Sequence, residues 1–299
     1  MKTVHIKAYA KVNLFLDIVG VEDGFHMLDT VVSTINLFDE ITISKRKDKK
    51  IVLKTPMSLY FVCDDIDNNA YKAAKLFIDT FDTCGVDITL KKNIPIGSGL
   101  GGSSADIAGV LLGLKKLYEI EEDVKPLADM LGSDSGYMLT GGYARLTKKG
   151  NKVELLDIDK KMYMVVIPAK GGVNTTECYK LYDTCGLKPI ENGSQKMIEH
   201  LADNQLIGED FYNALYLPAT MLNENVRRAY ETLKALSPTA VLMSGSGSSV
   251  YAVFDSFELC MWAHSKVKYD FKDSFVTETL SYKELNKKSR SLYSIEEND

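Results

Sequence analysis

Glycine and serine dominate one stretch of the sequence, and their spacing suits the binding of a phosphate group. The stretch reads Pro95-Ile96-Gly97-Ser98-Gly99-Leu100-Gly101-Gly102-Ser103-Ser104-Ala105-Asp106. It lies between an alternating apolar run at 86–90 and a helix-like run at 105–118. Glycine lets the backbone approach a ligand closely and tolerates a positive φ. A helix start presents unpaired N–H groups and the positive end of the helix dipole. We therefore predict that an anionic group binds here.

Two common nucleotide-binding motifs fit this loop poorly. Gly97, Gly99 and Gly102 match the spacing G-x-G-x-x-G, but a dinucleotide-binding fold needs a second strand about 20 residues further on, ending in an acidic residue. Here a proline separates the strand from the glycines, and the pattern over 119–130 predicts a helix. A Walker A loop needs a lysine after the last glycine, where this chain has serine. The structural alternative is a flexible turn that binds nothing; the helix directly behind the loop favours a phosphate site.

Composition and charge indicate an ordinary globular protein that acts on small molecules. The 299 residues are 45% apolar and 26% charged, and this length allows two domains. A net charge of −5 provides no general affinity for nucleic acid or anionic membranes. The five cysteines show no metal-ligand spacing, and the sequence has no apolar signal core or membrane-length run. We expect a cytoplasmic protein with reduced thiols, which binds neither nucleic acid nor membranes.

The elements that must position the glycine loop follow from periodicity. Alternation predicts strands over 4–16 and 28–44, joined by a turn at 21–26, and helical spacing predicts helices over 68–81 and 105–118. Lys11 and Asn13 fall one pleat apart on the first strand, so their side chains share a face and can reach a common site. For the stretch 51–67 the sequence predicts only a strand and a loop.

A charged stretch and a following strand at 163–168 predict a domain change near residue 158, which gives domains 1–157 and 158–299. Helices are predicted over 195–200 and 213–236. Two apolar strands within 240–254 flank a Ser/Gly-rich hairpin, which has more glycine than a turn needs. Either a close approach to a ligand or to the other domain, or a loose hairpin, explains this composition. The polar tail 281–299 predicts a surface helix followed by disorder.

Three blocks of the sequence resemble the three motifs of the GHMP kinase family, the small-molecule kinases related to galactokinase, homoserine kinase and mevalonate kinase. The blocks are 8–14, 95–106 and 243–254. The resemblance is most specific over 5–45, where Lys11 and Asn13 are followed by Asp23-Gly24-Phe25-His26. It implies an α+β, two-domain GHMP kinase fold, with a ribosomal-protein-S5-like N-terminal domain and a ferredoxin-like C-terminal domain. Within the family, the chain resembles the branch that phosphorylates a cytidine-diphosphate-linked polyol in the non-mevalonate route to isoprenoid precursors.

The resemblance also implies roles for individual residues. Asp134 matches the acid that takes a proton from the substrate hydroxyl, and Lys11 matches a lysine beside it. Phe25 and His26 would hold the cytosine, with Tyr179 on its other face. Asn13, Gly245 and Gly247 would face the substrate. The ATP-binding residues would be Asn68, Pro95, Gly97, Ser98, Gly99, Leu100, Gly101, Gly102, Ser103 and Ser104. ATP and Mg²⁺ are the implied cofactors, and the Mg²⁺ ligands stay open.

Each of these residues also has a purely structural interpretation. An aspartate such as Asp134 after Gly-Ser is often a helix cap, Lys11 could be a solvated edge charge, and Phe25 and Tyr179 could be core aromatics. Two functional alternatives stay open as well. One is a kinase of the same family for another small alcohol of the mevalonate, homoserine or sugar type, and the other is a catalytically silent sensor. We expect a monomer or homodimer.

Overall fold

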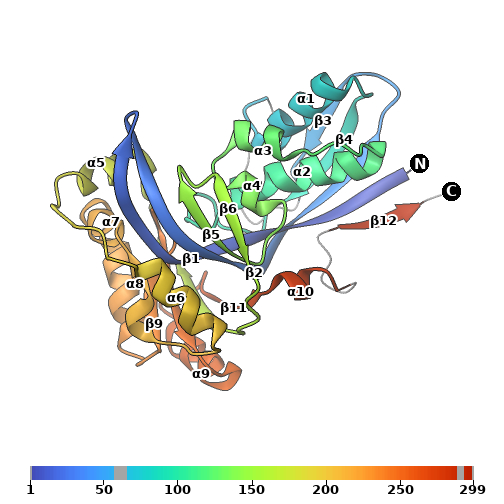
Figure 1. Cartoon of the computed structure of the whole chain (residues 1–299). Helices are drawn as coiled ribbons and strands as arrows, with labels where there is room; N and C mark the ends of the chain where they lie inside the picture. The colour runs from blue at the N-terminus through green and yellow to red at the C-terminus, as the bar shows by residue number, and fades with distance from the viewer. Residues whose placement is uncertain (1, 57–65, 288–292, 298–299) are drawn as a thin grey trace.

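The computed structural model describes residues 2–56, 66–287 and 293–297 of the chain. Two long antiparallel strands form its spine: β1 (Lys2–Glu22) and β2 (Phe25–Lys45), each of 21 residues. The turn between them places Asp23 and Gly24 at φ values of 49° and 76°, the geometry of a tight hairpin turn. Both strands run through the two halves of the molecule (Figure 1). The predicted strands and turn are confirmed, and the strands are longer than the sequence pattern indicated.

The N-terminal half is a sheet covered by helices. On β2, antiparallel pairing adds β4 (Val86–Lys91) and β5 (Tyr143–Lys148); beyond them lie β3 (Ile51–Lys54) and β6 (Lys152–Leu156). The helices are α1 (Asn69–Phe81), α2 (Gly102–Tyr118), α3 (Lys125–Leu131) and α4 (Ser135–Met138). Part of the stretch 51–67, for which only a strand and a loop were predicted, lies outside the described residues.

Helix α2 packs directly against the spine because two of its residues have no side chain. A Cβ on Gly109 would lie 2.8 Å from Ile41 Cδ1, and one on Gly113 would lie 2.6 Å from Ile6 Cδ1. The glycines thus let the helix lie close to both long strands.

The prediction of a helix over 119–130 is wrong for the first part of that range. Glu119 takes a left-handed φ of 58° that ends α2, and α3 begins only at Lys125.

The C-terminal half adds four antiparallel strands to the same sheet, through pairing of β11 with β2, and helices pack against them. Its strand order is β11-β7-β10-β9, which is the ferredoxin-like order. The strands are β7 (Tyr163–Pro168), β9 (Ala240–Met243), β10 (Ser249–Phe254) and β11 (Phe275–Leu280). The helices are α5 (Thr175–Tyr182), α6 (Gly193–Ala202), α7 (Tyr216–Leu222), α8 (Glu224–Lys234) and α9 (Phe257–Val267), and a short strand β8 (Tyr212–Asn213) pairs with β1.

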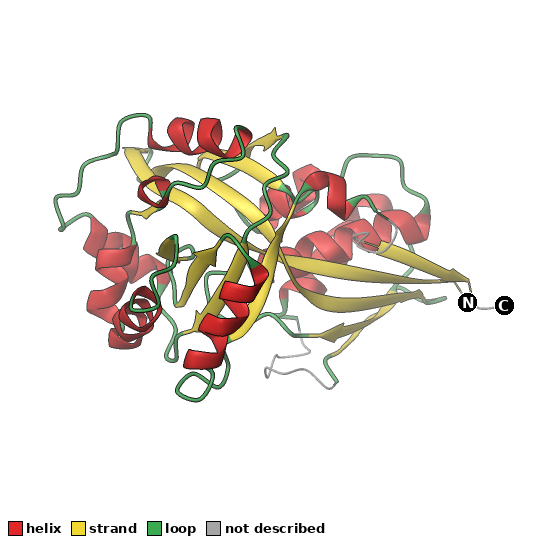
Figure 2. Cartoon of the chain, turned by 90° about the horizontal axis from the view of Figure 1, so that it is seen from below, coloured by secondary structure: helices red, strands yellow, loops and turns green. Residues whose placement is uncertain are grey.

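One prediction for this half is wrong, and a second is wrong in part. The single helix predicted over 213–236 is two helices, because Asn223 takes an extended conformation and caps α8 with its side chain. In the predicted tail, the surface helix is confirmed as α10 (Tyr282–Leu285), which begins with a capping box, but the strand β12 (Tyr293–Glu297) lies where disorder was predicted. Strand β12 pairs antiparallel with the start of β1, and the two lie side by side in Figure 2. Backbone hydrogen bonds from β1 order this polar segment.

Buried apolar side chains gather mainly in two clusters, and each takes residues from both halves. Leu16 and Ile18 of the first strand pack in the C-terminal cluster, while Met162 and Met164 pack in the N-terminal one. The domain boundary at 157/158 stays a prediction. In the described ranges no helix is long and apolar enough to cross a membrane. Cys84, Cys178, Cys185 and Cys260 are free thiols, and Cys63 lies outside the described residues.

Candidate active site

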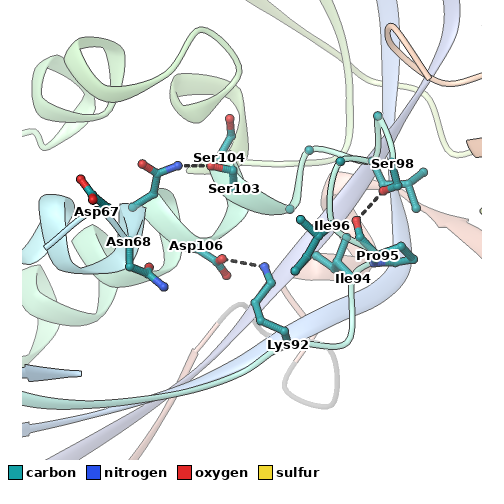
Figure 3. A pocket seen from close by; sticks show the side chains of 16 residues that line it. Asp67, Asn68, Lys92, Ile94, Pro95, Ile96, Ser98, Ser103, Ser104 and Asp106 are labelled. Carbon is teal, nitrogen blue, oxygen red and sulfur yellow. Dashed lines mark hydrogen bonds and ion pairs between the residues drawn. The ribbon is translucent and has the colours of Figure 1, made fainter. Parts of the chain in front are cut away.

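The glycine loop forms the wall of a cavity of about 360 Å³ (Figure 3). The loop leads from β4 to the start of α2, and Gly101, with a φ of 75°, is the N-cap residue of that helix. The cavity is lined by all ten residues predicted to bind ATP: Asn68, Pro95, Gly97, Ser98, Gly99, Leu100, Gly101, Gly102, Ser103 and Ser104. Asn68 also caps α1, since its Oδ1 accepts the Ala70 N–H at 2.8 Å. Backbone N–H groups at the start of α2 thus lie on the wall of a cavity large enough for part of a nucleotide.

The glycines of the loop are needed for different physical reasons. Gly97 has a φ of 62°, and a Cβ there would meet nothing within 4 Å, so this glycine borders open space. A Cβ on Gly99 would overlap the carbonyl oxygen of Ser244, and one on Gly101 would overlap Met138 and lie 3.1 Å from Lys11 Cγ. The sequence analysis attributed the glycines to a ligand. For Gly99 and Gly101 the close approach is to the protein itself.

The Ser/Gly hairpin between β9 and β10 packs directly on this loop. Ser244 Oγ donates to the Gly99 carbonyl at 2.9 Å, and the Ser249 N–H donates to the Ser98 carbonyl at 2.9 Å. A Cβ on Gly247 would lie 2.9 Å from Met243 Sδ. Of the two interpretations of this hairpin, the close approach to the other half of the chain is therefore the one observed.

Lys11 and Asp134 form a partly buried ion pair beside the loop. Lys11 Nζ lies 3.4 Å from Asp134 Oδ2, and the two side chains are 5% and 28% exposed. Lys11 Nζ also donates to Asn13 Oδ1 at 2.5 Å, and that oxygen accepts the Gly245 N–H at 2.9 Å. Asn13 Nδ2 donates to Thr30 Oγ1 at 2.9 Å. Asn13 therefore fixes the lysine and the third motif relative to each other.

The structure separates the two interpretations of Asp134. The residue stands at the N-cap position of α4, but its side chain makes no capping hydrogen bond there. Its carboxylate faces Lys11 instead. A carboxylate held next to a lysine and still 28% exposed can accept a proton from a bound alcohol.

Two aromatic side chains pack on each other at the tip of the β1–β2 hairpin and on α5. His26 and Tyr179 have ring centroids 4.8 Å apart, and Phe25 is 55% exposed at the hairpin tip. Burial raises the pKa of Tyr179, and the negative charge of Asp134 raises it further. That contribution places Tyr179 within electrostatic reach of the carboxylate.

Sequence reasoning missed Lys149, which connects this cluster to Asp134. Its Nζ lies 3.4 Å from the centroid of the Phe25 ring, a cation–π contact. The next residue, Gly150, would place a Cβ 3.6 Å from Asp134 Oδ1. The β5–β6 turn therefore carries a cation along the space between Phe25 and Asp134. The only sequence signal for Lys149 is the group of lysines around this turn, and such groups usually lie on a solvated surface.

Sequence reasoning also missed a buried charge cluster at the wall of the cavity, which Lys92 and Asp106 help to line. Lys92 Nζ donates to Asp39 Oδ2 and, at 2.6 Å, to Asp106 Oδ2. Figure 3 shows Lys92 and Asp106 pointing toward one another. Asp106 Oδ1 is buried and has no hydrogen-bond partner among the described residues. Burial raises the pKa of Asp106 to about 8, with Lys92 opposing the rise and Asp39 adding to it. Burial and the nearby Asp39 charge thus favour the neutral form of Asp106.

This cluster predicts a pH effect on stability. Because the folded pKa of Asp106 is raised, its contribution is fully present below the unfolded pKa, near 4, and is lost as the pH rises toward 8. Between pH 5 and 8 the free energy of unfolding should fall more steeply in the wild type than in Asp106→Asn, by up to about 1.4 kcal/mol per pH unit. Urea unfolding at several pH values measures this difference, with the exposed, lysine-paired Asp79→Asn as control. Parallel curves for wild type and Asp106→Asn would contradict it.

Sequence comparison places the chain in a known class. The model for the GHMP kinases N terminal domain matches residues 68–144, and that for the GHMP kinases C terminal domain matches residues 192–259. Together with the relatives below, these matches show that the chain belongs to the GHMP kinase family and has its two-domain α+β fold. It is 34% identical over 282 residues to the 4-diphosphocytidyl-2-C-methyl-D-erythritol kinase of Clostridium beijerinckii, which covers 92% of this chain and 99% of that protein. The kinase of the same name from Clostridium botulinum is 33% identical over 289 residues, with 93% and 100% covered.

Solved structures agree with this placement. A crystal structure of 4-(cytidine 5'-diphospho)-2C-methyl-D-erythritol kinase superposes with a TM-score of 0.78 at 29% identity, covering 92% of this chain and 98% of the other. Homoserine kinase from Cytophaga hutchinsonii, at 17% identity and a TM-score of 0.69, covers 98% of this chain and 97% of its own. At that identity the second likeness shows the shared fold alone.

Proposed function

We propose that this chain transfers the γ-phosphoryl group of ATP to the 2-hydroxyl of 4-diphosphocytidyl-2-C-methyl-D-erythritol, a step of non-mevalonate isoprenoid precursor biosynthesis. The carrying observation is the position of the Lys11–Asp134 pair. Lys11 lies next to Gly101 of the glycine loop and Gly245 of the hairpin. Its partner Asp134 lies next to the β5–β6 turn, whose Lys149 contacts the ring of Phe25. A proton acceptor thus lies between a phosphate cradle and an aromatic cluster. The relatives that match nearly the whole chain bear the name of this kinase.

In the proposed reaction Asp134 accepts the proton of the acceptor hydroxyl. The hydroxyl oxygen forms a bond to the γ-phosphorus while the bond from that phosphorus to the β,γ-bridging oxygen breaks, and ADP leaves with the electron pair. Such a transfer depends mainly on positioning and on neutralising charge. Lys11, held by Asn13, lies where it can offset the negative charge that gathers around the carboxylate and the incoming phosphoryl group.

The cavity at the glycine loop fits ATP. Gly97 leaves open space beside the backbone, and the N–H groups at the start of α2 suit phosphate oxygens. In the described part of the chain no three His, Cys, Asp or Glu side chains cluster to hold a metal ion. Mg²⁺ would therefore be held largely by phosphates and water, with the hydroxyls of Ser103 and Ser104 on the cavity wall. When bound, it neutralises phosphate charge.

The aromatic cluster fits the cytidyl end of the acceptor. Phe25 offers an exposed ring face, and the rings of His26 and Tyr179 lie 4.8 Å apart. Lys149 lies in the span that the diphosphate must cross between the base and the reacting hydroxyl, where a cation would offset its charge.

Replacing Phe25 should weaken acceptor binding without slowing chemistry. Stacking on an aromatic ring is worth about 1–3 kcal/mol per base, so Phe25→Ala should raise KM for the cytidyl substrate roughly 5- to 150-fold. The kcat and the KM for ATP should stay within about threefold of the wild type, because the ring binds the base equally well in the ground state and in the transition state. Phe257→Ala, an aromatic of similar exposure on α9, is the control. A changed kcat with an unchanged KM would contradict this role.

A coupled assay of ADP release tests the function as a whole. With ATP, Mg²⁺ and the cytidyl substrate we expect turnover, and with mevalonate, homoserine or galactose we expect none. Turnover on one of those alcohols alone would replace the proposed acceptor and keep the kinase class. Binding of the cytidyl substrate without ADP release would favour a silent binding protein.

A further inference from the structure

Two residues of α5 and the C-cap residue that follows it hold the ring of His26. Tyr179, Tyr182 and Asp183 are spaced i, i+3 and i+4, so they share a helix face. Tyr179 stacks on the imidazole at 4.8 Å and 34°, and Tyr182 meets it edge-on at 6.2 Å and 85°. The carboxylate Oδ1 of Asp183 lies 2.7 Å from Nε2 of His26. The imidazole side chain is 19% exposed, so the helix leaves it little freedom to rotate.

This arrangement decides which ring nitrogen carries the hydrogen. A carboxylate can only accept a hydrogen bond, so Nε2 of His26 must donate to Asp183. In a neutral imidazole one nitrogen donates and the other accepts. In that neutral form, the hydrogen held on Nε2 leaves Nδ1 as a hydrogen-bond acceptor. The second nitrogen therefore presents a lone pair to any ligand that reaches it.

An acceptor at this place distinguishes two pyrimidine bases. Cytosine carries an amino group, a donor, at the position where uracil carries a carbonyl, an acceptor. A lone pair on Nδ1 attracts the amino group and repels the carbonyl oxygen. We propose that Asp183 is a positioning residue that holds His26 as an acceptor and thereby makes the acceptor site select a cytidine over a uridine diphosphate group. The inference rests on the proposed function, because it takes His26 to face the base.

Binding of CDP and UDP to the whole protein, measured by titration calorimetry, tests the inference. The wild type should bind CDP at least about tenfold more tightly than UDP, since an unmatched buried hydrogen-bonding group weakens binding by that order. The amide in Asp183→Asn can donate as well as accept, so it no longer dictates the hydrogen on Nε2. We expect the CDP/UDP ratio to fall below about threefold. Asp183→Glu, which keeps the carboxylate, should restore much of the ratio.

Two further readouts separate positioning from a general structural effect. The long-range ¹⁵N spectrum, with His26 signals assigned by their loss in His26→Gln, should show a protonated Nε2 and an unprotonated Nδ1 in the wild type. In Asp183→Asn this pattern should change. In turnover, that variant should raise KM for the cytidyl substrate and keep kcat within about threefold.

The chain offers a matched control in a second histidine–aspartate pair. His200 Nδ1 lies 2.7 Å from Asp210 Oδ2, away from the aromatic cluster. Asp210→Asn makes the same chemical change and should leave the CDP/UDP ratio as in the wild type. An unchanged ratio in Asp183→Asn, or a hydrogen on Nδ1 in the wild type, overturns the inference and leaves the kinase proposal intact. A wild type that binds neither nucleotide overturns the cytidyl acceptor itself, and the inference with it.

Discussion

Asp134→Asn should lower kcat by about 10²- to 10⁴-fold, the usual contribution of a positioned general base. Asparagine keeps the size and one oxygen of the side chain but cannot take a proton from the acceptor hydroxyl. The KM for ATP should change little, because the carboxylate faces Lys11 and makes no contact that holds the glycine loop. Single-turnover phosphoryl transfer under saturating ATP and acceptor measures the chemical step directly.

The control for this variant is Asp129→Asn on the neighbouring helix α3. Asp129 is paired with Lys125 at 2.5 Å and has no contact with Lys11, so its variant should keep wild-type turnover. Turnover within about threefold of the wild type in Asp134→Asn would remove Asp134 as the base and would favour catalysis by positioning alone.

Local patterns were enough to predict the elements that carry the site. Alternation located the two long strands, and placing Lys11 and Asn13 one pleat apart predicted that their side chains share a face, where the structure has them in contact at 2.5 Å. Helical spacing after Asn68 and after the glycine loop located α1 and α2. These features depend on neighbours in sequence, which is why periodicity reveals them. The roles assigned to the individual site residues stay proposals.

Contacts between distant segments could not be predicted in the same way. Asp106 is one polar residue in an otherwise apolar helix pattern, and its meeting with Lys92 and Asp39 depends on how α2 packs on the sheet. Lys149 gains its place only when the β5–β6 turn folds back toward Phe25. The break in the helix predicted over 213–236 likewise follows from the conformation of Asn223, which no apolar period records.

The same argument explains the glycine loop. Its composition predicted an anion site, but the structure gives Gly99 a second task, because the carbonyl of Ser244 from the other half of the chain occupies the space of its missing side chain. Ser244 Oγ also donates to the Gly99 carbonyl, and Asn13 holds Gly245 next to Lys11. The glycine loop, Lys11 and the β9–β10 hairpin are thus connected by direct contacts, and a change at Gly99 should disturb all three.

Among glycine-to-alanine substitutions in the loop, Gly99→Ala should therefore cause the largest loss of activity. The residue has a φ of 77°, a conformation that costs a residue with a Cβ about 1–2 kcal/mol. In addition, the new methyl would overlap Ser244 O and lie 3.0 Å from Gly247 O, so the loop and the hairpin must separate. Because misplacing a reacting group by about 1 Å can cost on the order of 10²-fold in rate, kcat/KM for ATP should fall by about that factor. Steady-state kinetics and urea unfolding measure the two effects.

Two alanine variants separate backbone strain from the steric clash. Gly186→Ala has a φ of 64° with nothing within 4 Å of the new Cβ, so it carries the strain without a clash. It should lose about 1–2 kcal/mol of unfolding free energy and keep wild-type kinetics. Gly97→Ala, at 62° and also in open space, adds only the methyl that would face bound phosphate. If Gly99→Ala lost no more activity than Gly186→Ala, contact between the hairpin and the loop would not be what holds the phosphate cradle. A larger loss in Gly99→Ala than in Gly97→Ala would show that the hairpin contact matters more than space beside the ligand.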